Sequence, residues 1–219
     1  MNQTIRDLVL LFPCGKRPWY DPNGEGLCVW AAYQPKGAVS FAASLLDISG
    51  KGNNAGDPGG AGTPTWDTVN GWTFDGVAQY LTTTFRPSND QTQSGICQFS
   101  GAITAGGFLF GCDQAALREF GIVPQWVEYN NGNQALVGPA LAAGNLAVAG
   151  AQGYRNGAAE GAAIGAWAGA TVQNLYIGCK LDTGVPGNFL QCNIQALAIY
   201  DCTLTATQIS AIAARMASL

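Results

Sequence analysis

Hydrophobic and polar residues alternate along much of this chain in the manner of half-buried β-strands. The clearest case is segment 71–81, where Trp72 and Phe74 are separated by polar residues and Asp75-Gly then favours a turn. β-branched and aromatic residues resume at 80–85. Similar patterns predict further strands at 27–33, 96–104, 107–111, 120–123, 125–129, 146–150, 154–155, 175–179 and 189–200.

Turn and cap signals complete this pattern. The Asn-Gly pairs at 131–132 and 156–157 predict tight hairpins, and segment 39–46 fits either a strand or a short helix. The periodicity becomes helical near the C-terminus, where Thr205 and Gln208 form a capping box before spaced apolar residues. The sequence therefore predicts an all-β fold, an antiparallel β-sandwich of jelly-roll type with a short C-terminal helix.

The N-terminal residues differ from the rest of the chain. Pro13, Pro18 and Pro22 enforce irregular, extended backbone. We expect an extended arm over 1–25, covered by its own domain or by a neighbour, and one jelly-roll domain over 26–219. The first apolar run has no basic leader or cleavage site and is too short to span a bilayer, so neither an export signal nor a membrane partner is expected.

Charge is sparse, and histidine is absent. Charged residues are 11% of the 219 residues and the formal net charge is −4. The ten Lys and Arg are scattered, which disfavours nucleic-acid binding. The low charge fits either a surface covered by partners or a Gly- and Ala-rich β protein. Without histidine, the Ser/His/Asp and Cys/His nucleophilic arrangements are excluded.

Seven cysteines occur without a C-x-x-C pair, which argues against a zinc site. Four of them lie in apolar, strand-like runs: Cys28, Cys97, Cys179 and Cys192. We expect these four to be buried, reduced thiols of a protein made in a cytoplasm. Cys14 and Cys202 lie in less regular stretches and are the better candidates for a disulfide.

Several segments, in order, resemble the laminin-G-like, concanavalin A-like jelly-roll superfamily of lectins and glucanases. They include the Asp-x-Ser-Gly-x-Gly-Asn loop that begins at Asp47, the Phe-Asp-Gly segment at 74–76 and the Tyr-x-Asn-Gly hairpin at 154–157. The start of the predicted helix at 204–209 also fits. The resemblance covers roughly residues 26–212 and implies a fold more strongly than a function.

Many members of this superfamily bind calcium near these loops through carboxylates. This chain has Ala78 and Gln79 where relatives often carry acids. Oxygen donors remain at four positions: Asp47, Asn53, Asn54 and Asp75. The competing interpretation is that Asp47 and Asn53 close turns by hydrogen bonds to the backbone. No cofactor is predicted, and calcium is the alternative left open.

Other members of the superfamily are glycoside hydrolases, whose chemistry needs two carboxylates about 5–9 Å apart. The chain has no acidic pair at i and i+2, and its nearest spacings are Asp21/Glu25 and Asp113/Glu119, the latter across a predicted loop. Carboxylates from different strands could still converge. On this basis we expect a protein that is not an enzyme.

Carbohydrate binding is the competing function, because two groups combine aromatic rings with hydrogen-bonding side chains. The first group lies beside a predicted turn: Trp126, Glu128, Tyr129, Asn130 and Asn131. The second group is Tyr154, Arg155 and Trp167. The other interpretation, which we favour for both groups, is packing in the core or across strands.

The resemblance, the absence of an export signal, the retained initiator Met and the low charge lead to an expected function. The chain is expected to be a structural protein of a bacteriophage virion, decorating the capsid or associated with the tail. Its expected partners are other virion proteins, as a homo-oligomer or as capsid or tail subunits, after synthesis in the host cytoplasm. The alternative is a carbohydrate-binding module that recognises glycans of the host or of a cell surface.

Overall fold

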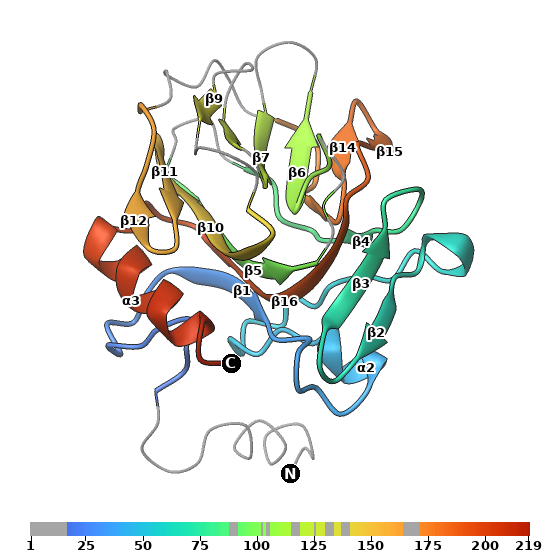
Figure 1. Cartoon of the computed structure of the whole chain (residues 1–219), viewed down its shortest axis with the longest axis horizontal. Coiled ribbons are helices and arrows are strands. Elements are labelled where there is room, and N and C mark those ends of the chain that lie inside the picture. Colours follow the sequence, from blue (N-terminus) through green and yellow to red (C-terminus); the bar gives the residue numbers. More distant parts are fainter. Residues whose placement is uncertain are drawn as a thin grey trace.

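The computed structural model describes residues 17–87, 92–101, 103, 106–114, 119–124, 126–129, 134–136, 141–163 and 171–219. Two β-sheets pack face to face, and a C-terminal helix lies against one of them (Figure 1). The predicted all-β sandwich with a short C-terminal helix is therefore confirmed.

The first sheet is built around the long strand β16 (Gln191–Tyr200). The sheet runs in the order β12 (Ala158–Ala159), β11 (Gln152–Arg155), β10 (Ala143–Ala149), β5 (Ser94–Ser100), β16, β3 (Gly71–Asp75) and β2 (Thr65–Asp67). The first half of β16 pairs with β3, and its second half pairs with β1 (Val29–Tyr33).

The second sheet covers the opposite side of the core. It runs in the order β15 (Val185–Gly187), β14 (Lys180–Asp182), β6 (Phe110–Asp113), β7 (Glu119–Val123), β8 (Trp126–Tyr129) and β9 (Gln134–Leu136). The short strand β13 (Tyr176–Ile177) pairs with β6 and with β4 (Leu81–Thr82). Most pairs in the described residues are antiparallel, whereas β14 runs parallel to β6.

The local turn and helix signals are largely realised. Asn156 and Gly157 have φ angles of 49° and 81°, the left-handed pair that a type I′ turn requires, and they join β11 to β12. The other Asn-Gly pair lies outside the described residues, and the strands on either side of it, β8 and β9, pair antiparallel. Segment 39–46 contains a helix, α2 (Phe41–Ser44).

The core between the sheets follows the predicted alternation. In β3, Trp72 and Phe74 are buried, Thr73 is half-buried and Asp75 is exposed. The Trp72 indole donates a hydrogen bond to Ser44 Oγ at 2.7 Å, so burial of this ring leaves no polar group unpaired. Each fully buried side chain of this size contributes about 1.5–3 kcal/mol.

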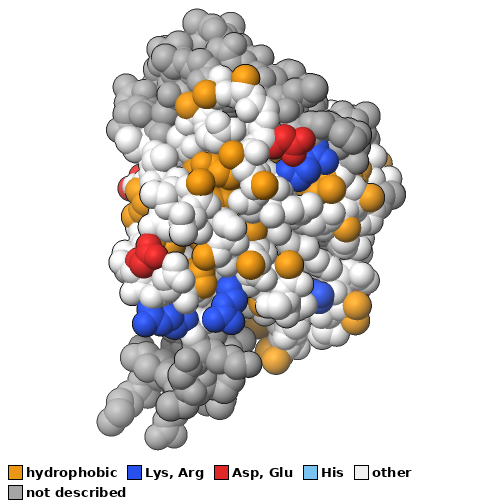
Figure 2. All heavy atoms as spheres, turned by 60° about the vertical axis from the view of Figure 1, so that its left-hand side comes forward, with side chains coloured by type: hydrophobic (Ala, Val, Ile, Leu, Met, Phe, Trp, Pro, Cys, Tyr) orange, Lys and Arg blue, Asp and Glu red, His pale blue; other side chains and the backbone are white. Residues whose placement is uncertain are grey.

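A second apolar layer lies on the other face of the first sheet, under α3 (Ala206–Met216). Ile209, Ile212 and Met216 recur at helical spacing and are buried. The sheet surface beneath them includes four small side chains, which allow a close approach: Ala147, Ala149, Ala196 and Ala198. Figure 1 shows α3 beside β10 and β12, as this packing requires. On the face shown in Figure 2, the charged side chains of the described residues are few and lie in separate small groups. No helix among the described residues is both long and apolar enough to cross a membrane.

The described part of the predicted arm packs on its own domain. Trp19 and Tyr20 are buried in the layer under α3. The Tyr20 hydroxyl donates to the carbonyl of Ile48 at 2.9 Å, and the Tyr20 carbonyl accepts from the Tyr200 hydroxyl at 2.9 Å. Residues 1–16 lie outside the described residues, so docking of the arm on neighbouring subunits stays a prediction.

Candidate functional site

A hollow of about 400 Å³ opens where β1 begins. Three distant segments form its wall: the start of β1, the loop after α2 and the turn after β16. Its lining residues are Cys28, Val29, Trp30, Lys51, Asn53 and Asp201. We call it the Trp30 hollow. A volume of this size falls within the usual range for small-molecule sites, roughly 300–1,000 Å³.

One buried carboxylate fixes the loop that carries Lys51 and Asn53. Asp47 accepts hydrogen bonds from the backbone N–H groups of Ala32 at 3.0 Å, Ser49 at 2.9 Å and Asn53 at 3.1 Å. The bond to Ala32 ties the loop to β1. The loop is therefore held against the strand that supplies Trp30.

These contacts bear on the calcium alternative. Asp47 closes turns through the N–H groups of Ser49 and Asn53, as the competing interpretation predicted. The Asn53 side chain instead donates from Nδ2 to the distant Trp30 carbonyl at 2.6 Å, which joins the loop to β1. Asp75 accepts from the N–H groups of Val77, Ala78 and Gln79 at 2.8, 3.1 and 3.3 Å. Partial burial opposes ionisation of Asp75, but these hydrogen bonds outweigh it and lower its pKa. The described residues contain no group of three or more Cys, Asp or Glu side chains placed to hold a metal ion.

Trp30 is the one aromatic residue among those that line the hollow. Its ring is half-buried and meets Phe85 edge to face, with centroids 5.1 Å apart. No described residue accepts a hydrogen bond from its indole N–H, and that nitrogen is not enclosed. Trp30 is thus supported from the core and offers a free donor to a ligand.

The polar residues around Trp30 are also available to a ligand. Lys51 and Asp201 are exposed, and in the described part of the chain neither side chain forms an ion pair. The Asp201 backbone is fixed by a hydrogen bond from its N–H to the Cys28 carbonyl at 2.9 Å. An aromatic ring beside an ammonium, a carboxylate and an indole N–H can hydrogen-bond the hydroxyls of a sugar and pack against its apolar face.

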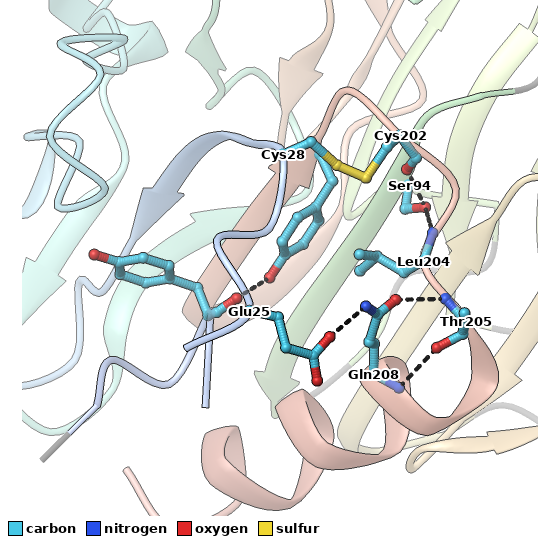
Figure 3. Close-up of a disulfide and its surroundings, with 9 residues drawn as sticks. Glu25, Cys28, Ser94, Cys202, Leu204, Thr205 and Gln208 are labelled. Atoms are coloured by element: carbon cyan, nitrogen blue, oxygen red, sulfur yellow. Dashed lines mark hydrogen bonds between the residues drawn. A yellow bond between two sulfur atoms is a disulfide. The ribbon is translucent and has the colours of Figure 1, made fainter. Parts of the chain in front are cut away.

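A disulfide between Cys28 and Cys202 borders the hollow (Figure 3). The two Cα atoms lie 5.9 Å apart across a sequence separation of 174 residues. Cys202, a predicted disulfide candidate, is therefore bonded to Cys28, and the expectation that Cys28 is among the reduced thiols is wrong. The reason is strand register: Val29 pairs with Tyr200, which brings positions 28 and 202 together at the strand ends. Cys14 lies outside the described residues.

The other described cysteines are buried thiols, as predicted for Cys97, Cys179 and Cys192; Cys112 joins them. Burial raises the pKa of the Cys179 thiol to about 12. Burial likewise raises the pKa values of Cys97 and Cys192. These thiols therefore act as small hydrophobic groups of the core.

Polar contacts fix the chain on both sides of the disulfide (Figure 3). The Ser94 hydroxyl donates to the Cys202 carbonyl at 2.7 Å and accepts from the Leu204 N–H at 3.0 Å. Gln208, in the predicted capping box, donates to the Glu25 carboxylate at 2.6 Å. This bond, followed by one from Asn23, lowers the pKa of Glu25. The border of the hollow is thus tied to α3 and to the N-terminal segment.

The described residues that line the hollow include none of the five residues proposed from the sequence as sugar ligands. Trp126 and Tyr129 lie in β8, where they pair with Val123 and Phe120 of β7. Asn131 and Trp167 lie outside the described residues. Tyr154 is only 6% exposed in the layer under α3, and burial raises its pKa. Tyr154 is thus placed in the core, as the competing interpretation predicted.

Acidic positions from different strands converge on the second sheet. Asp113 of β6 pairs in register with Glu119 of β7 and with Asp182 of β14. The predicted loop between Asp113 and Glu119 therefore joins two neighbouring strands. The Asp113 carboxylate lies 3.1 Å from the ammonium of Lys180, which lies 5.2 Å from the centre of the Phe108 ring.

No family profile matches this chain, and no curated protein matches it. Among solved structures, it resembles domain 4 of AbnA, a GH43 extracellular arabinanase from Geobacillus stearothermophilus, in complex with arabinotriose. That likeness has a TM-score of 0.57 and 16% identity, and covers 85% of this chain and 98% of that domain. Trypanosoma rangeli sialidase gives a TM-score of 0.53 and 15% identity, covering 87% of this chain but 33% of the sialidase.

These likenesses establish a sandwich fold shared with domains of carbohydrate-active proteins. They also correct one expectation: the chain was expected not to be an enzyme, whereas the solved structures that it resembles come from glycosidases. None of these matched structures is a laminin-G domain or a bacteriophage protein by its description. At such low identity, the likeness shows the fold alone.

Proposed function

We propose that this domain binds carbohydrate and that the Trp30 hollow is its binding site. The observation that carries the proposal is the combination found there. Trp30 is half-buried and lines the hollow beside Lys51 and Asp201, and among the described residues its indole N–H and these two side chains have no hydrogen-bond or ion-pair partner. Such a mixture of one aromatic surface and a few polar groups is typical of small-molecule sites.

The chemistry of a bound sugar would follow from these groups. The apolar face of a sugar ring packs on Trp30, and the indole N–H donates to a ring or hydroxyl oxygen. Lys51 donates to hydroxyl oxygens, and the Asp201 carboxylate accepts from hydroxyl groups. The Asp47 hydrogen bonds and the disulfide hold these residues before a ligand arrives, which reduces the entropy lost on binding.

The fold likeness supports the same class of ligand. The arabinanase domain that this chain covers almost completely was solved with arabinotriose, so a domain of this shape accommodates a short oligosaccharide in that protein. Recognition of a host or cell-surface glycan is compatible with this proposal. The virion role expected from the sequence, with its capsid or tail partners, remains a prediction.

A panel of glycans tests the proposal. The panel contains arabinotriose, linear arabinan, other neutral oligosaccharides and sialic-acid-containing glycans. We expect saturable binding of at least one glycan, weakened at least ~5-fold by Lys51→Ala and by Asp201→Ala, because each variant removes about 1 kcal/mol of hydrogen bonding. Arg215→Ala, which removes an exposed cation from α3, is the matched control and should bind normally. Absence of binding, or equal binding by all variants, contradicts the proposal.

A further inference from the structure

A second aromatic surface lies where β4 and β13 pair. Tyr80 precedes β4, Tyr176 lies in β13 and Phe189 precedes β16. The rings of Tyr80 and Tyr176 stack at 7° with centroids 5.3 Å apart, and Phe189 lies 6.3 Å from Tyr80. All three side chains are half-buried, and none lines the Trp30 hollow. We call these three residues the tyrosine platform.

The hydroxyl groups of the platform are free to bind a ligand. In the described part of the chain, neither the Tyr80 nor the Tyr176 hydroxyl has a hydrogen-bond partner, and neither oxygen is enclosed. The core tyrosine Tyr33 differs, because its hydroxyl donates to the Asn53 carbonyl at 2.6 Å. A purely structural stack does not require two hydroxyl groups that lack a partner and are not enclosed.

Charge near the platform indicates which ligand it suits. The carboxylate of Asp75, five residues before Tyr80, accepts hydrogen bonds from three backbone N–H groups. Asp57 accepts from the Gly59 N–H at 3.0 Å and from the Thr63 hydroxyl at 2.6 Å. Both carboxylates accept hydrogen bonds from groups within their own turns. The platform therefore presents rings and neutral hydroxyl groups, which suit an uncharged sugar.

We propose that the tyrosine platform is a second sugar-binding surface, for a neutral segment of the same glycan chain that occupies the Trp30 hollow. This inference rests on the proposed function. It makes the ligand an extended neutral polysaccharide instead of a single terminal sugar.

One loop connects the two surfaces. Asn53 lines the hollow, Gly56 pairs with Thr82 at the end of β4, and the Gly62 carbonyl accepts from the Tyr80 N–H at 2.9 Å. Asn53 and Gly62 are 62 − 53 = 9 residues apart in the sequence. Nine residues span at most about 30 Å, which sets an upper limit on the distance between the two ends of this loop. Simultaneous binding to two linked sites raises the overall affinity.

The inference is tested by comparing the affinities of the protein for arabinotriose and for linear arabinan, each expressed per binding site on the glycan. In the wild-type protein we expect at least ~10-fold tighter binding of the polymer. Tyr80→Ala and Tyr176→Ala should bring the ratio of arabinan affinity to arabinotriose affinity near one. The arabinotriose affinity itself should stay unchanged. Trp66→Ala, which removes a half-buried ring from β2, is the aromatic control and should keep the wild-type ratio. Thermal unfolding establishes that each variant is folded.

The outcomes separate the two proposals. If arabinotriose binds normally and the tyrosine variants keep the wild-type ratio, the platform is not a sugar-binding surface and the Trp30 proposal stands. If the wild-type protein binds neither probe, both proposals fail for this glycan class. A measurement without variants gives the same distinction: arabinan, but not arabinotriose, should protect Tyr80 and Tyr176 from nitration, detected by mass spectrometry. Equal nitration with and without arabinan overturns the inference.

Discussion

The Cys28–Cys202 disulfide fixes the first residue of the Trp30 hollow to the turn that supplies Asp201. It closes a loop of 174 residues, and Val29 pairs with Tyr200 directly beside it. Two walls of the hollow that are distant in the sequence are therefore covalently joined.

Removal of this disulfide should destabilise the domain. A cross-link over so long a loop contributes about 2–5 kcal/mol, largely by restricting the unfolded chain. We expect Cys28→Ser/Cys202→Ser to unfold about 5–15 °C below the oxidised wild type in thermal scans. Reducing agent should lower the wild-type midpoint and leave the double variant unchanged. Equal midpoints for oxidised and reduced wild type would contradict this account of the bond.

Loss of the Asp47 carboxylate should loosen the loop that lines the hollow. Asp47→Ala leaves the N–H groups of Ala32, Ser49 and Asn53 without their acceptor. We expect a loss of about 2–4 kcal/mol in the free energy of unfolding, measured by denaturant titration. Asp201→Ala removes an exposed acid of the same hollow and should change stability by less than about 0.5 kcal/mol. Similar losses for both variants would show that Asp47 has no special structural role.

Stability should decrease above pH 10. Burial, with the charges of Asp47 and Asp21, raises the pKa of Tyr20 from 10.0 to about 12. A phenol with a raised pKa in the folded state keeps its proton longer there than in the unfolded chain. The contribution of this phenol to the free energy of unfolding is complete below pH 10 and is lost as the pH rises toward about 12. Burial raises the pKa of Tyr200 in the same direction.

Denaturant midpoints between pH 8 and pH 11.5 measure this effect, with tyrosinate absorbance recorded in parallel. Tyr200→Phe removes one of the buried phenols and should reduce the slope of stability against pH. It should also lower stability at pH 8, because the Tyr20 carbonyl loses its donor. A midpoint that stays constant from pH 10 to pH 11.5 would refute the predicted dependence.

Tyr154→Ala should act on the core and not on a ligand. Tyr154 lies under α3, and its replacement leaves a cavity there, with an expected cost of about 3–5 kcal/mol. Denaturant titration measures this cost. The folded fraction should bind glycan with wild-type affinity. Weaker binding at unchanged stability would instead support the sugar-ligand role first suggested by the sequence.

The alternation of Trp72 and Phe74 and the Asn-Gly turn at 156–157 could be predicted because each depends on neighbouring residues. The period of two reports directly which side chains face a core. Pairing between distant strands leaves no such local signal. The sequence could not show that β1 lies beside β16, and so Cys28 was expected to be a reduced thiol although it is bonded to Cys202.

The candidate site was missed for the same reason. Trp30 was assigned to the predicted strand at 27–33, and Lys51 to the predicted loop that begins at Asp47. Asp201 carried no signal at all. Their proximity depends on strand register and on the hydrogen bonds of Asp47. The resemblance of the loop at 47–54 to a lectin-superfamily loop was the one signal that indicated this region.

Calorimetric titration of arabinotriose into the wild-type protein and into Trp30→Ala tests the central claim most directly. The account predicts saturable binding by the wild type and at least ~10-fold weaker binding by the variant, with both proteins folded in thermal scans. Trp66→Ala should retain the wild-type affinity. Undiminished binding by a folded Trp30→Ala protein would contradict the account.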